Sequence, residues 1–307
     1  MHNAQPWRFH YSRGSRTFRV YADLERVMPH ADPDTRALHL GCGAALLNLR
    51  VAITHADRHP VTTLLPDDKD PTLLATVRLT SPTSDDDELG ALYPAIHERH
   101  TSRYPFAETE ISDAVLTRLG NAARQEGAVL TFPASWHLGW VMELADEAQA
   151  RNLTDRGNAD DLARWTRVGA AVADTASDGV PEYAFGPHKL GGKTPMRDFA
   201  GGRPTSDLGT TAFENTPHLA LLSTAGDRPP DWLHAGQAME RVLLLATLNG
   251  LAGSFITQAL EWPDLRWPLR DPVSGTGYVQ MVLRLGYGPQ GPTTPRRPVR
   301  EVLEIEP

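Results

Sequence analysis

Residues 38–62 read LHLGCGAALLNLRVAITHADRHPVT, and residues 233–257 read LHAGQAMERVLLLATLNGLAGSFIT. The two stretches align without a gap at a shift of 195 positions (233 − 38 = 195). Each joins an apolar helix pattern to a strand-like end. We predict from this repeat two related halves that pack on each other, a dimer-like arrangement within one chain. The alternative is two unrelated amphipathic helices, because apolar helices match by chance quite easily.

The strands that follow the two stretches favour the first interpretation. Residues 77–79 read VRL and residues 283–285 read LRL, each downstream of its own apolar helix. The two regions therefore share an order of helix and strand as well as some identical residues.

The rest of the chain predicts a mixture of helices and strands. Trp7, Phe9 and Tyr11 alternate with polar residues, which is typical of a half-buried strand, and a turn at 13–16 makes it the first arm of a hairpin. Asp32, Ser112 and Asp231 are candidate helix caps. The predicted helices are 33–56, 112–127, 138–175 and 232–249, and the predicted strands are 7–12, 17–21, 61–65, 73–79, 129–132, 218–223 and 278–285.

Two segments lack periodicity. Residues 81–88, SPTSDDDE, are predicted to form a solvated acidic loop. Residues 178–209 are rich in Gly and Pro, and a loop of that length within a compact domain is often a functional lid.

Composition limits the classes of function. The 307 residues carry a formal net charge of −8, which argues against nucleic acid as a partner, because such binding depends on cations that contact phosphates. Cys42 is the one cysteine, so neither an internal disulfide nor a cysteine-rich metal site can form. We find no apolar run near 18 residues and no signal-peptide pattern at the start, and therefore expect no membrane span and a cytoplasmic protein.

The first candidate motif is residues 2–9, HNAQPWRF. The amides of Asn3 and Gln5 each offer hydrogen-bond donors and acceptors, and Pro6 stiffens the chain before the strand. The chemistry alone fits a ligand contact, but it fits an ordinary strand entrance with two solvated amides better.

The second motif is residues 99–103, RHTSR. Two Arg side chains, two hydroxyls and a His lie within five residues, and Arg is the preferred bidentate partner of phosphate. Such a cluster in an acidic protein predicts an anion site as strongly as it predicts a solvated basic turn.

The third motif is spread over the C-terminal region as GLAGS at 250–254, LGYG at 285–288 and PRRP at 295–298. The glycines allow close approach of the backbone to a ligand, and the Arg pair is a further candidate phosphate contact. Each of these patterns is weak when taken alone.

Taken in order, these blocks resemble the nitroreductase superfamily, and in particular its actinobacterial Acg-like branch. The resemblance runs from residue 2 to about residue 303, and HNAQPWRF is its most specific block. It implies an α+β fold with antiparallel-cored sheets flanked by helices. It also implies that two nitroreductase-like halves lie in one chain as a pseudo-dimer, with an N-terminal half at 1–95 and a C-terminal half at 96–307 that contains the lid.

The resemblance implies FMN as the cofactor and NAD(P)H as the reductant. Carried over by position, Arg99, Thr101 and Arg103 hold the FMN phosphate and Arg296 joins them from the tail. Asn3 and Gln5 meet the flavin or its ribityl chain, with His2 nearby, and Gly253 and Ser254 approach the ring. No side chain is implied as a catalytic acid or base, because the flavin carries the hydride chemistry.

The sequence departs from the family pattern in three ways. The Arg block follows the Asn-Gln-Pro-Trp block here, whereas the usual order within one half is the reverse, which is consistent with two halves that share one site. The helix that usually precedes the first block is absent, so either the chain starts short or this member lacks that helix. Thr101 replaces the usual Ser and keeps a hydroxyl.

Two other patterns suggest a metal site and a phosphate-binding loop, but both are better explained without a ligand. His55 and His59 have a metal-ligand spacing, but no third ligand accompanies them and a zinc site needs at least three. Residues 192–194, GKT, lack the upstream glycine and apolar strand of a phosphate-binding loop.

Three functions remain open at this stage. The first is an FMN-dependent oxidoreductase that passes electrons from NAD(P)H to a small nitroaromatic- or quinone-like acceptor, as a monomer with an internal pseudo-dimer or as a homodimer. The second is a protein that sequesters FMN beneath the lid at 178–209. The third is a specialised flavoenzyme that acts on one metabolite.

Overall fold

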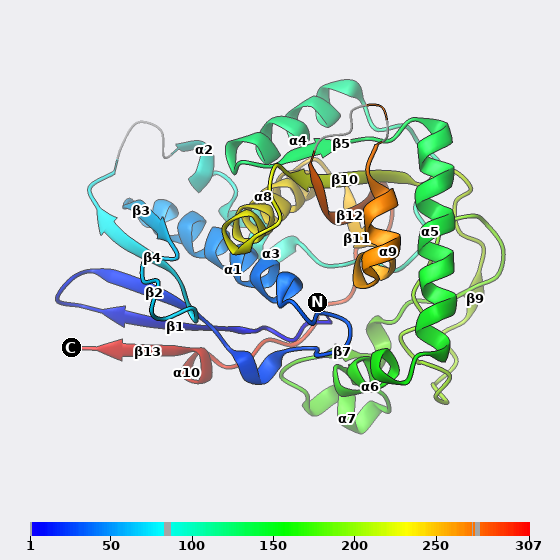
Figure 1. The fold of residues 1–307 in the computed structure, drawn as a ribbon, viewed down its shortest axis with the longest axis horizontal. Helices are drawn as coiled ribbons and strands as arrows, with labels where there is room; N and C mark the ends of the chain where they lie inside the picture. Colours follow the sequence, from blue (N-terminus) through cyan, green and yellow to red (C-terminus); the bar gives the residue numbers. More distant parts are fainter. Residues whose placement is uncertain (1, 83–86, 272, 274–276) are drawn as a thin grey trace.

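A computed structural model describes residues 2–82, 87–271, 273 and 277–307 of the chain. Two mixed layers of helix and sheet meet along a pair of long central helices, α1 (Arg36–His55) and α8 (Pro229–Leu248) (Figure 1). This is the α+β fold class that the sequence predicts. The remaining helices are η1 (Leu24–Arg26), α2 (Asp87–Gly90), α3 (Tyr93–Glu98), α4 (Asp113–Gln125), α5 (Ser135–Thr154), α6 (Arg156–Arg164), α7 (Ala170–Thr175), η2 (Glu182–Ala184), η3 (Gln258–Glu261), α9 (Pro263–Arg266), η4 (Trp267–Leu269) and α10 (Val299–Val302).

One sheet has the strand order β13-β1-β2-β4-β3, and the other has the order β11-β12-β10-β5. All neighbouring strands are antiparallel except β1 and β13, which run parallel. Two short parallel pairs, β6 with β7 and β8 with β9, lie in and beside the predicted lid. The strands are β1 (Trp7–Ser12), β2 (Thr17–Ala22), β3 (His59–Leu64), β4 (Leu73–Thr80), β5 (Val129–Thr131), β6 (Thr166–Arg167), β7 (Val180–Pro181), β8 (His188–Lys189), β9 (Thr210–Thr211), β10 (His218–Thr224), β11 (Ala252–Phe255), β12 (Tyr278–Gly286) and β13 (Leu303–Glu306).

The two sheets share a strand order. The series β3-β4-β2-β1 in the first sheet matches β11-β12-β10-β5 in the second, and in each sheet the central helix lies in sequence between the same two pairs of strands. This match supports the interpretation of two related halves. The division at residues 95 and 96 stays a prediction, and β13 from the C-terminus completes the N-terminal sheet.

One glycine from each central helix, Gly43 and Gly236, lies where the two helices cross. A Cβ added to Gly236 would lie 2.2 Å from the carbonyl oxygen of Leu40, and one added to Gly43 would lie 2.5 Å from that of Leu233. A side chain at either position would therefore push the helices apart. The sequence repeat pairs Gly41 with Gly236, but Gly41 faces Pro6 instead, and Gly43 makes the close helix contact.

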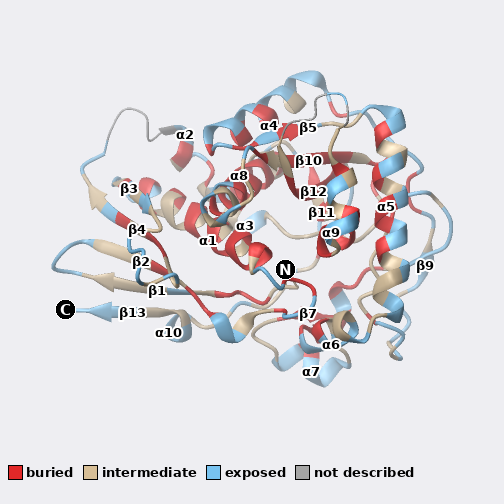
Figure 2. Ribbon diagram, in the orientation of Figure 1, coloured by how far each residue is buried: buried red, intermediate tan, exposed pale blue. Residues whose placement is uncertain are grey.

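Burial is concentrated on this crossing, and Figure 2 shows buried residues along both central helices. By length and composition alone α1 is apolar enough to cross a membrane, so the prediction that no stretch of the chain has that character is wrong. In the fold, 67% of its apolar window is buried inside the protein, as in the core helix of a folded domain.

Several element boundaries differ from the predictions. Helix α1 begins at Arg36 rather than at residue 33, because Asp32 accepts hydrogen bonds from the backbone of Ala37 (2.8 Å) and Leu38 (2.9 Å) across an intervening turn. Helix α8 begins at Pro229, and Asp231 lies within its first turn. The predicted helix 138–175 is divided into α5, α6 and α7, because Asp155 and Gly169 leave helical geometry.

Other expectations can be compared only in part. The hairpin of β1 and β2 is confirmed, and so are strands at β3, β4, β5, β10 and β12. Within the predicted acidic loop 81–88, residues 83–86 lie outside the described residues, and α2 begins at Asp87. The ring of His55 stacks on Tyr93 with centroids 3.9 Å apart.

Candidate functional site

A cavity of about 660 Å³ lies beside the central helices, within the size range of small-molecule sites. Its wall is formed by the N-terminal segment, α1, α8, β11, the Arg99–Arg103 block, the lid and the C-terminal tail. Among its lining residues are His2, Asn3, Gln5, Arg99, Thr101, Arg103, Ser254 and Arg296. Gly253, the ninth predicted residue, pairs with Thr101 in an isolated parallel bridge just behind this wall.

The wall of this cavity is cationic. It carries Arg99, Arg103, Arg197 and Arg296, against the one carboxylate of Glu240. The whole chain has a net charge of −8, so this local excess of guanidinium groups runs against the overall balance. Such a concave cationic wall attracts an anionic ligand.

The Arg99–Arg103 block is fixed through Ser102 and Thr101. The backbone N–H of Ser102 donates to the carbonyl of Gly253 (2.9 Å), and its hydroxyl donates to the carbonyl of Pro289 (2.6 Å). A Cβ at Gly291 would lie 1.9 Å from the carbonyl oxygen of Thr101, so the tail can pass here only as glycine. The block is thereby held between β11 and the C-terminal tail, and Arg99, His100, Thr101 and Arg103 line the cavity.

Arg99 and Arg296 lie on the tail side of the cavity. Arg99 forms an ion pair with the buried Glu240 (3.3 Å), which also accepts from the amide of Asn48 (3.1 Å). Arg296 donates to the side chains of Thr294 (2.9 Å) and Asn3 (3.1 Å). Partial burial, followed by the positive charges of Arg99 and Arg296, lowers the pKa of His100. His100 is therefore favoured in its neutral form beside two cations.

Arg103 is turned toward the lid instead. Its guanidinium donates to the carbonyl of Ala184 (2.8 Å) and lies over the ring of Phe199, 4.5 Å from its centroid. Burial first, and the charge of Arg197 second, lower the pKa of Arg103 to about 10. The side chain therefore stays charged near neutral pH.

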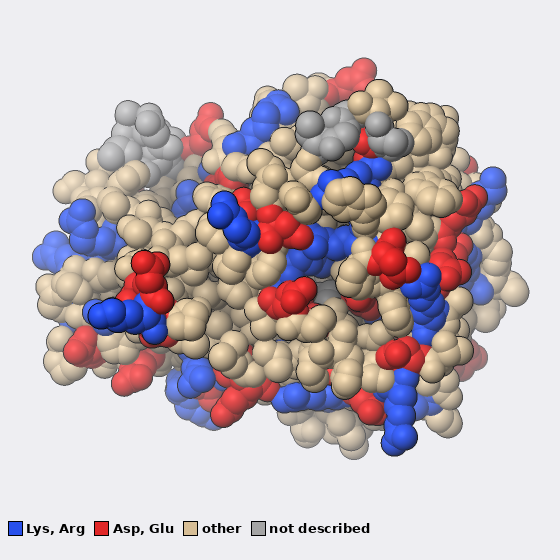
Figure 3. Space-filling view, in the orientation of Figure 1, with Lys and Arg blue, Asp and Glu red and all other residues tan. Residues whose placement is uncertain are grey.

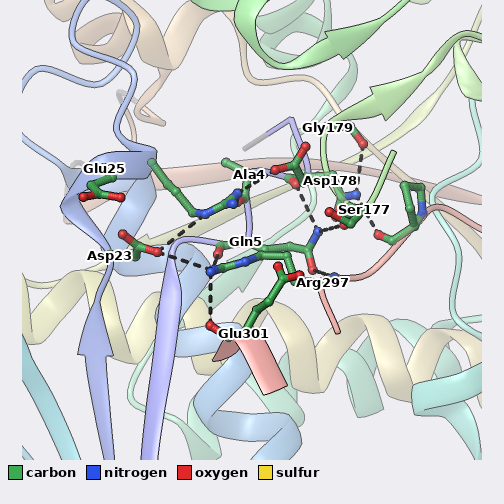
Figure 4. Close-up of polar contacts among 12 residues, drawn as sticks. Ala4, Gln5, Asp23, Glu25, Ser177, Asp178, Gly179, Arg297 and Glu301 are labelled. Carbon is green, nitrogen blue, oxygen red and sulfur yellow. Dashed lines mark hydrogen bonds and ion pairs between the residues drawn. The ribbon is translucent and has the colours of Figure 1, made fainter. Parts of the chain in front are cut away.

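The amides of Asn3 and Gln5 bind the protein itself, and Figure 4 shows Gln5 beside Ser177 and Arg297. Asn3 donates to the carbonyls of Gly179 and Pro295, both at 3.0 Å. Gln5 donates to the carbonyl of Ser177 (3.0 Å) and accepts from the backbone of Arg297 (2.9 Å). The two side chains thus fasten both the base of the lid and the tail to the N-terminal segment. Their predicted contact with the flavin stays a prediction.

A second contact holds the base of the lid. Asp178 forms ion pairs with Arg26 (2.8 Å) and Arg167 (2.5 Å). Burial alone would raise the pKa of Asp178, but hydrogen bonds from Arg26 and Arg167 outweigh it and hold that pKa below its usual value. The carboxylate is therefore ionised across the physiological range, and the lid base stays anchored.

A larger cavity of about 990 Å³ lies at the N-terminal ends of α1 and α8. Figure 3 shows acidic and basic side chains crowded together near the middle of the face that these helix ends approach. The carboxylates on its wall are Asp32, Asp34, Asp67, Asp68, Asp227 and Glu261, and the arginines are Arg36, Arg266 and Arg270. An excess of carboxylates repels a phosphate. We therefore assign the candidate site to the smaller, cationic cavity.

Similar proteins support the same family. No protein-family model matches the chain. A Mycobacterium tuberculosis protein named as a candidate NAD(P)H nitroreductase is 30% identical over 309 residues, which cover 99% of this chain and 87% of the relative. The chain belongs to the nitroreductase family. Another candidate NAD(P)H nitroreductase of the same organism, named Acg, is 26% identical over 310 residues, or 99% of this chain and 91% of Acg.

Solved structures give more distant matches to this nitroreductase-family protein. A nitroreductase with bound FMN from Desulfitobacterium hafniense aligns with 68% of this chain and 95% of its own, at 14% identity and a TM-score of 0.42. A BluB-like flavoprotein from Clostridium difficile aligns with 69% of this chain and 96% of its own, at 14% identity and a TM-score of 0.43. The family assignment rests on the sequence relatives.

The structure adds cavity residues that sequence reasoning missed in this nitroreductase-family chain. Arg197 and Phe199 line the cavity from the lid. The lid sequence has no periodicity, so it did not indicate which of its side chains face the cavity. Glu240 reaches it from α8. A lone carboxylate within the apolar run of that helix was a usable signal, because a buried carboxylate requires a partner.

Proposed function

We propose that this protein is an FMN-dependent oxidoreductase. The observation that carries the proposal is the cationic cavity of an acidic chain, which gathers eight of the nine residues assigned from the family pattern. The names of the relatives as NAD(P)H nitroreductases agree with it. Bound FMN supplies the hydride chemistry, with NAD(P)H as the reductant and a nitroaromatic- or quinone-like compound as the acceptor in a ping-pong cycle.

The residues present fit FMN. Arg99, Arg296 and the hydroxyl of Thr101 are the donors that would hold its phosphate. The small residues Ala44 and Ser254 leave room for a planar ring near the central helix and β11. The protein's own task is to bind and orient the cofactor. Asn3 contributes by accepting a hydrogen bond from Arg296, which helps to orient that guanidinium.

One chain provides every residue of the proposed site. We therefore propose a monomer with an internal pseudo-dimer as the smallest functional unit. Analytical ultracentrifugation of the FMN-bound protein tests this: an active species at the mass of one chain is expected, and flavin binding confined to the dimer would contradict it.

The experiment that tests the proposal is an anaerobic absorbance spectrum of the purified protein, recorded before and after addition of NADPH. A yellow protein that bleaches within seconds is expected. A colourless protein that cannot be loaded with FMN would overturn the proposal.

The second candidate function is sequestration of FMN with little turnover. The fastening of the lid base by Asn3, Gln5 and Asp178 favours it, because a lid that stays closed would exclude both substrates. The same spectrum separates the two functions: a yellow protein that NADPH and NADH both leave oxidised would favour sequestration.

A further inference from the structure

The arginines and histidines of the cavity form two separate groups. The tail-side group consists of Arg99, His100 and Arg296, which interact with one another. The lid-side group consists of His2, Arg103 and Arg197: the ring of Phe199 contacts His2 and Arg103, and the charge of Arg197 acts on both of them. One phosphate requires one such group, so the other is available to a different anion.

The lid-side group has a small net positive charge. Arg197 pairs with Glu261 (2.5 Å) and lies 3.5 Å from the hydroxyl of Thr257. Among the described residues, Arg103 has no carboxylate within ion-pair distance. Two guanidinium groups against one carboxylate leave a charge of about +1, which suits a monoanion such as a carboxylate.

His2 adds an unfilled hydrogen-bonding position. Both of its ring nitrogens are buried, and neither has a hydrogen-bond partner in the described part of the chain. Burial first, and the charge of Arg197 second, lower the pKa of His2 well below its usual value. The neutral ring offers one donor and one acceptor, and a buried polar group without a hydrogen-bond partner is destabilising. A ligand with polar oxygens would satisfy at least the donor.

Phe199 gives the same place an aromatic surface. The guanidinium of Arg103 covers the ring at 4.5 Å, and the imidazole of His2 meets it edge-on with centroids 5.8 Å apart. Phe185 stacks behind it at 5.8 Å. The lid therefore presents cationic, neutral polar and aromatic groups together within one cavity.

We propose that the lid-side group binds the carboxylate of an aromatic electron acceptor, so that the physiological substrate is an aromatic acid rather than a neutral nitroaromatic or quinone. The proposal rests on the proposed function and specifies its second substrate. Arg103 and Arg197 contact the carboxylate, His2 donates to it, and Phe199 packs against the aromatic body.

The test measures equilibrium binding in the absence of reductant, so that no turnover takes place. The probes are 4-nitrobenzoate and its uncharged methyl ester, titrated by calorimetry into the FMN-loaded protein. Wild type should bind the acid at least about tenfold more tightly than the ester, since one charge-assisted hydrogen bond contributes about 1.5–3 kcal/mol and 1.4 kcal/mol is tenfold.

Two variants separate the Arg197 contact from the lid-side charge: a double variant removes the Arg197 guanidinium and keeps the net charge near +1, and a single variant raises that charge to about +2. Arg197→Met alone would leave the buried Glu261 without its cation, so it is combined with Glu261→Gln, which keeps the amide contact from Asn152. The double variant should lose the preference for the acid, with unchanged binding of the ester. Glu261→Gln alone frees the Arg197 charge and should tighten binding of the acid a few-fold. It also keeps the proposal testable if the double variant does not fold.

The controls separate failure of this inference from failure of the proposed function. Arg270→Ala removes an arginine from the acidic cavity and should leave the binding of both probes unchanged. If wild type does not bind FMN, the proposed function fails. If FMN binds but the double variant keeps its preference for the acid, the lid-side assignment is overturned. The assignment is also overturned if the double variant loses FMN, because the lid-side group would then hold the FMN phosphate. It is overturned as well if the variant changes only the KM for NADPH relative to NADH, because the group would then hold the phosphate of NADPH.

Discussion

The two cavities of this protein have common building elements but opposite charge. Residues of α1 and α8 line both of them, and one ion pair links them, because Arg197 lines the smaller cavity and its partner Glu261 lines the larger. Four arginines against one carboxylate make the smaller wall cationic, and six carboxylates against three arginines make the larger wall acidic. The sign of the wall charge, rather than the volume, indicates which cavity holds a phosphate.

The largest expected effect comes from the helix crossing that supports both cavities. Gly236→Ala places a methyl group 2.2 Å from the carbonyl of Leu40, so the free energy of unfolding should fall by about 3 kcal/mol or more. Urea unfolding followed by circular dichroism measures the loss. Gly139→Ala on α5, where a Cβ meets nothing within 4 Å, is the matched control and should be neutral or stabilising. Equal stability of the two variants would contradict the close-contact explanation.

The next effect separates the two cavities. Arg99→Ala combined with Arg296→Ala removes the two tail-side arginines from the smaller wall and should weaken FMN binding at least about 100-fold, since each charge-assisted hydrogen bond contributes about 1.5–3 kcal/mol. Fluorescence titration with FMN measures it. Arg270→Ala is the matched loss of an arginine from the acidic wall and should leave FMN affinity unchanged. Undiminished flavin binding by the double variant would sink the assignment of the phosphate site.

A smaller effect is expected at the lid of the cationic cavity. Asn3→Ala combined with Gln5→Ala removes the side-chain hydrogen bonds to Ser177, Gly179 and the tail, each contributing about 1 kcal/mol. The lid should open more often, so FMN should dissociate about tenfold faster and limited proteolysis within 178–209 should accelerate. Asn121→Ala on the exposed face of α4 is the control. Unchanged rates would mean that the two amides do not fasten the lid.

The smallest effect lies in the acidic cavity and depends on pH. Burial raises the pKa of Asp227, but hydrogen bonds from Arg266, Trp232 and Gln280 outweigh it and lower that pKa to about 2. A carboxyl group with a depressed folded pKa stabilises the fold above its unfolded pKa near 4 and ceases to do so as the pH falls toward 2. Asp227→Asn should therefore cost about 1 kcal/mol at pH 7, and the difference from wild type should vanish between about pH 4 and 2. Thermal melts at several pH values measure this loss of stability. A change in the FMN affinity of Asp227→Asn would contradict the assignment of FMN to the cationic cavity alone.

Local patterns in the sequence predicted much of the fold. The alternation at Trp7 to Tyr11 gave the first hairpin, and the apolar periodicity around Leu40 and Leu243 gave the two central helices. These elements are predictable because backbone geometry imposes a fixed period on neighbouring residues. The helix boundaries were less accurate. Asp32, for example, caps α1 across a turn that no short motif describes.

The candidate site was predictable only where its residues lie close together in sequence. The Arg99–Arg103 block could be recognised as a cluster, and the structure brings it to the cavity. Phe199 could not be recognised, because its importance depends on contacts with Arg103 and His2, far away in the chain. Arg197 could not be recognised either, because its partner Glu261 is equally distant in sequence. The amides of Asn3 and Gln5 were recognised, but their partners at Ser177 and Gly179 were not.

The triplets VRL and LRL show that similar local sequence does not determine whether a side chain is buried. Both specify a strand, yet Arg78 is exposed on β4, whereas Arg284 on β12 is fully buried and paired with Glu214. The sequence by itself determined the periods of the helices and strands, the excess of acid and the clustered arginines, because these depend on neighbouring residues. Only the tertiary structure decided which charges meet, because burial and ion pairing depend on residues that the fold brings together from distant parts of the chain.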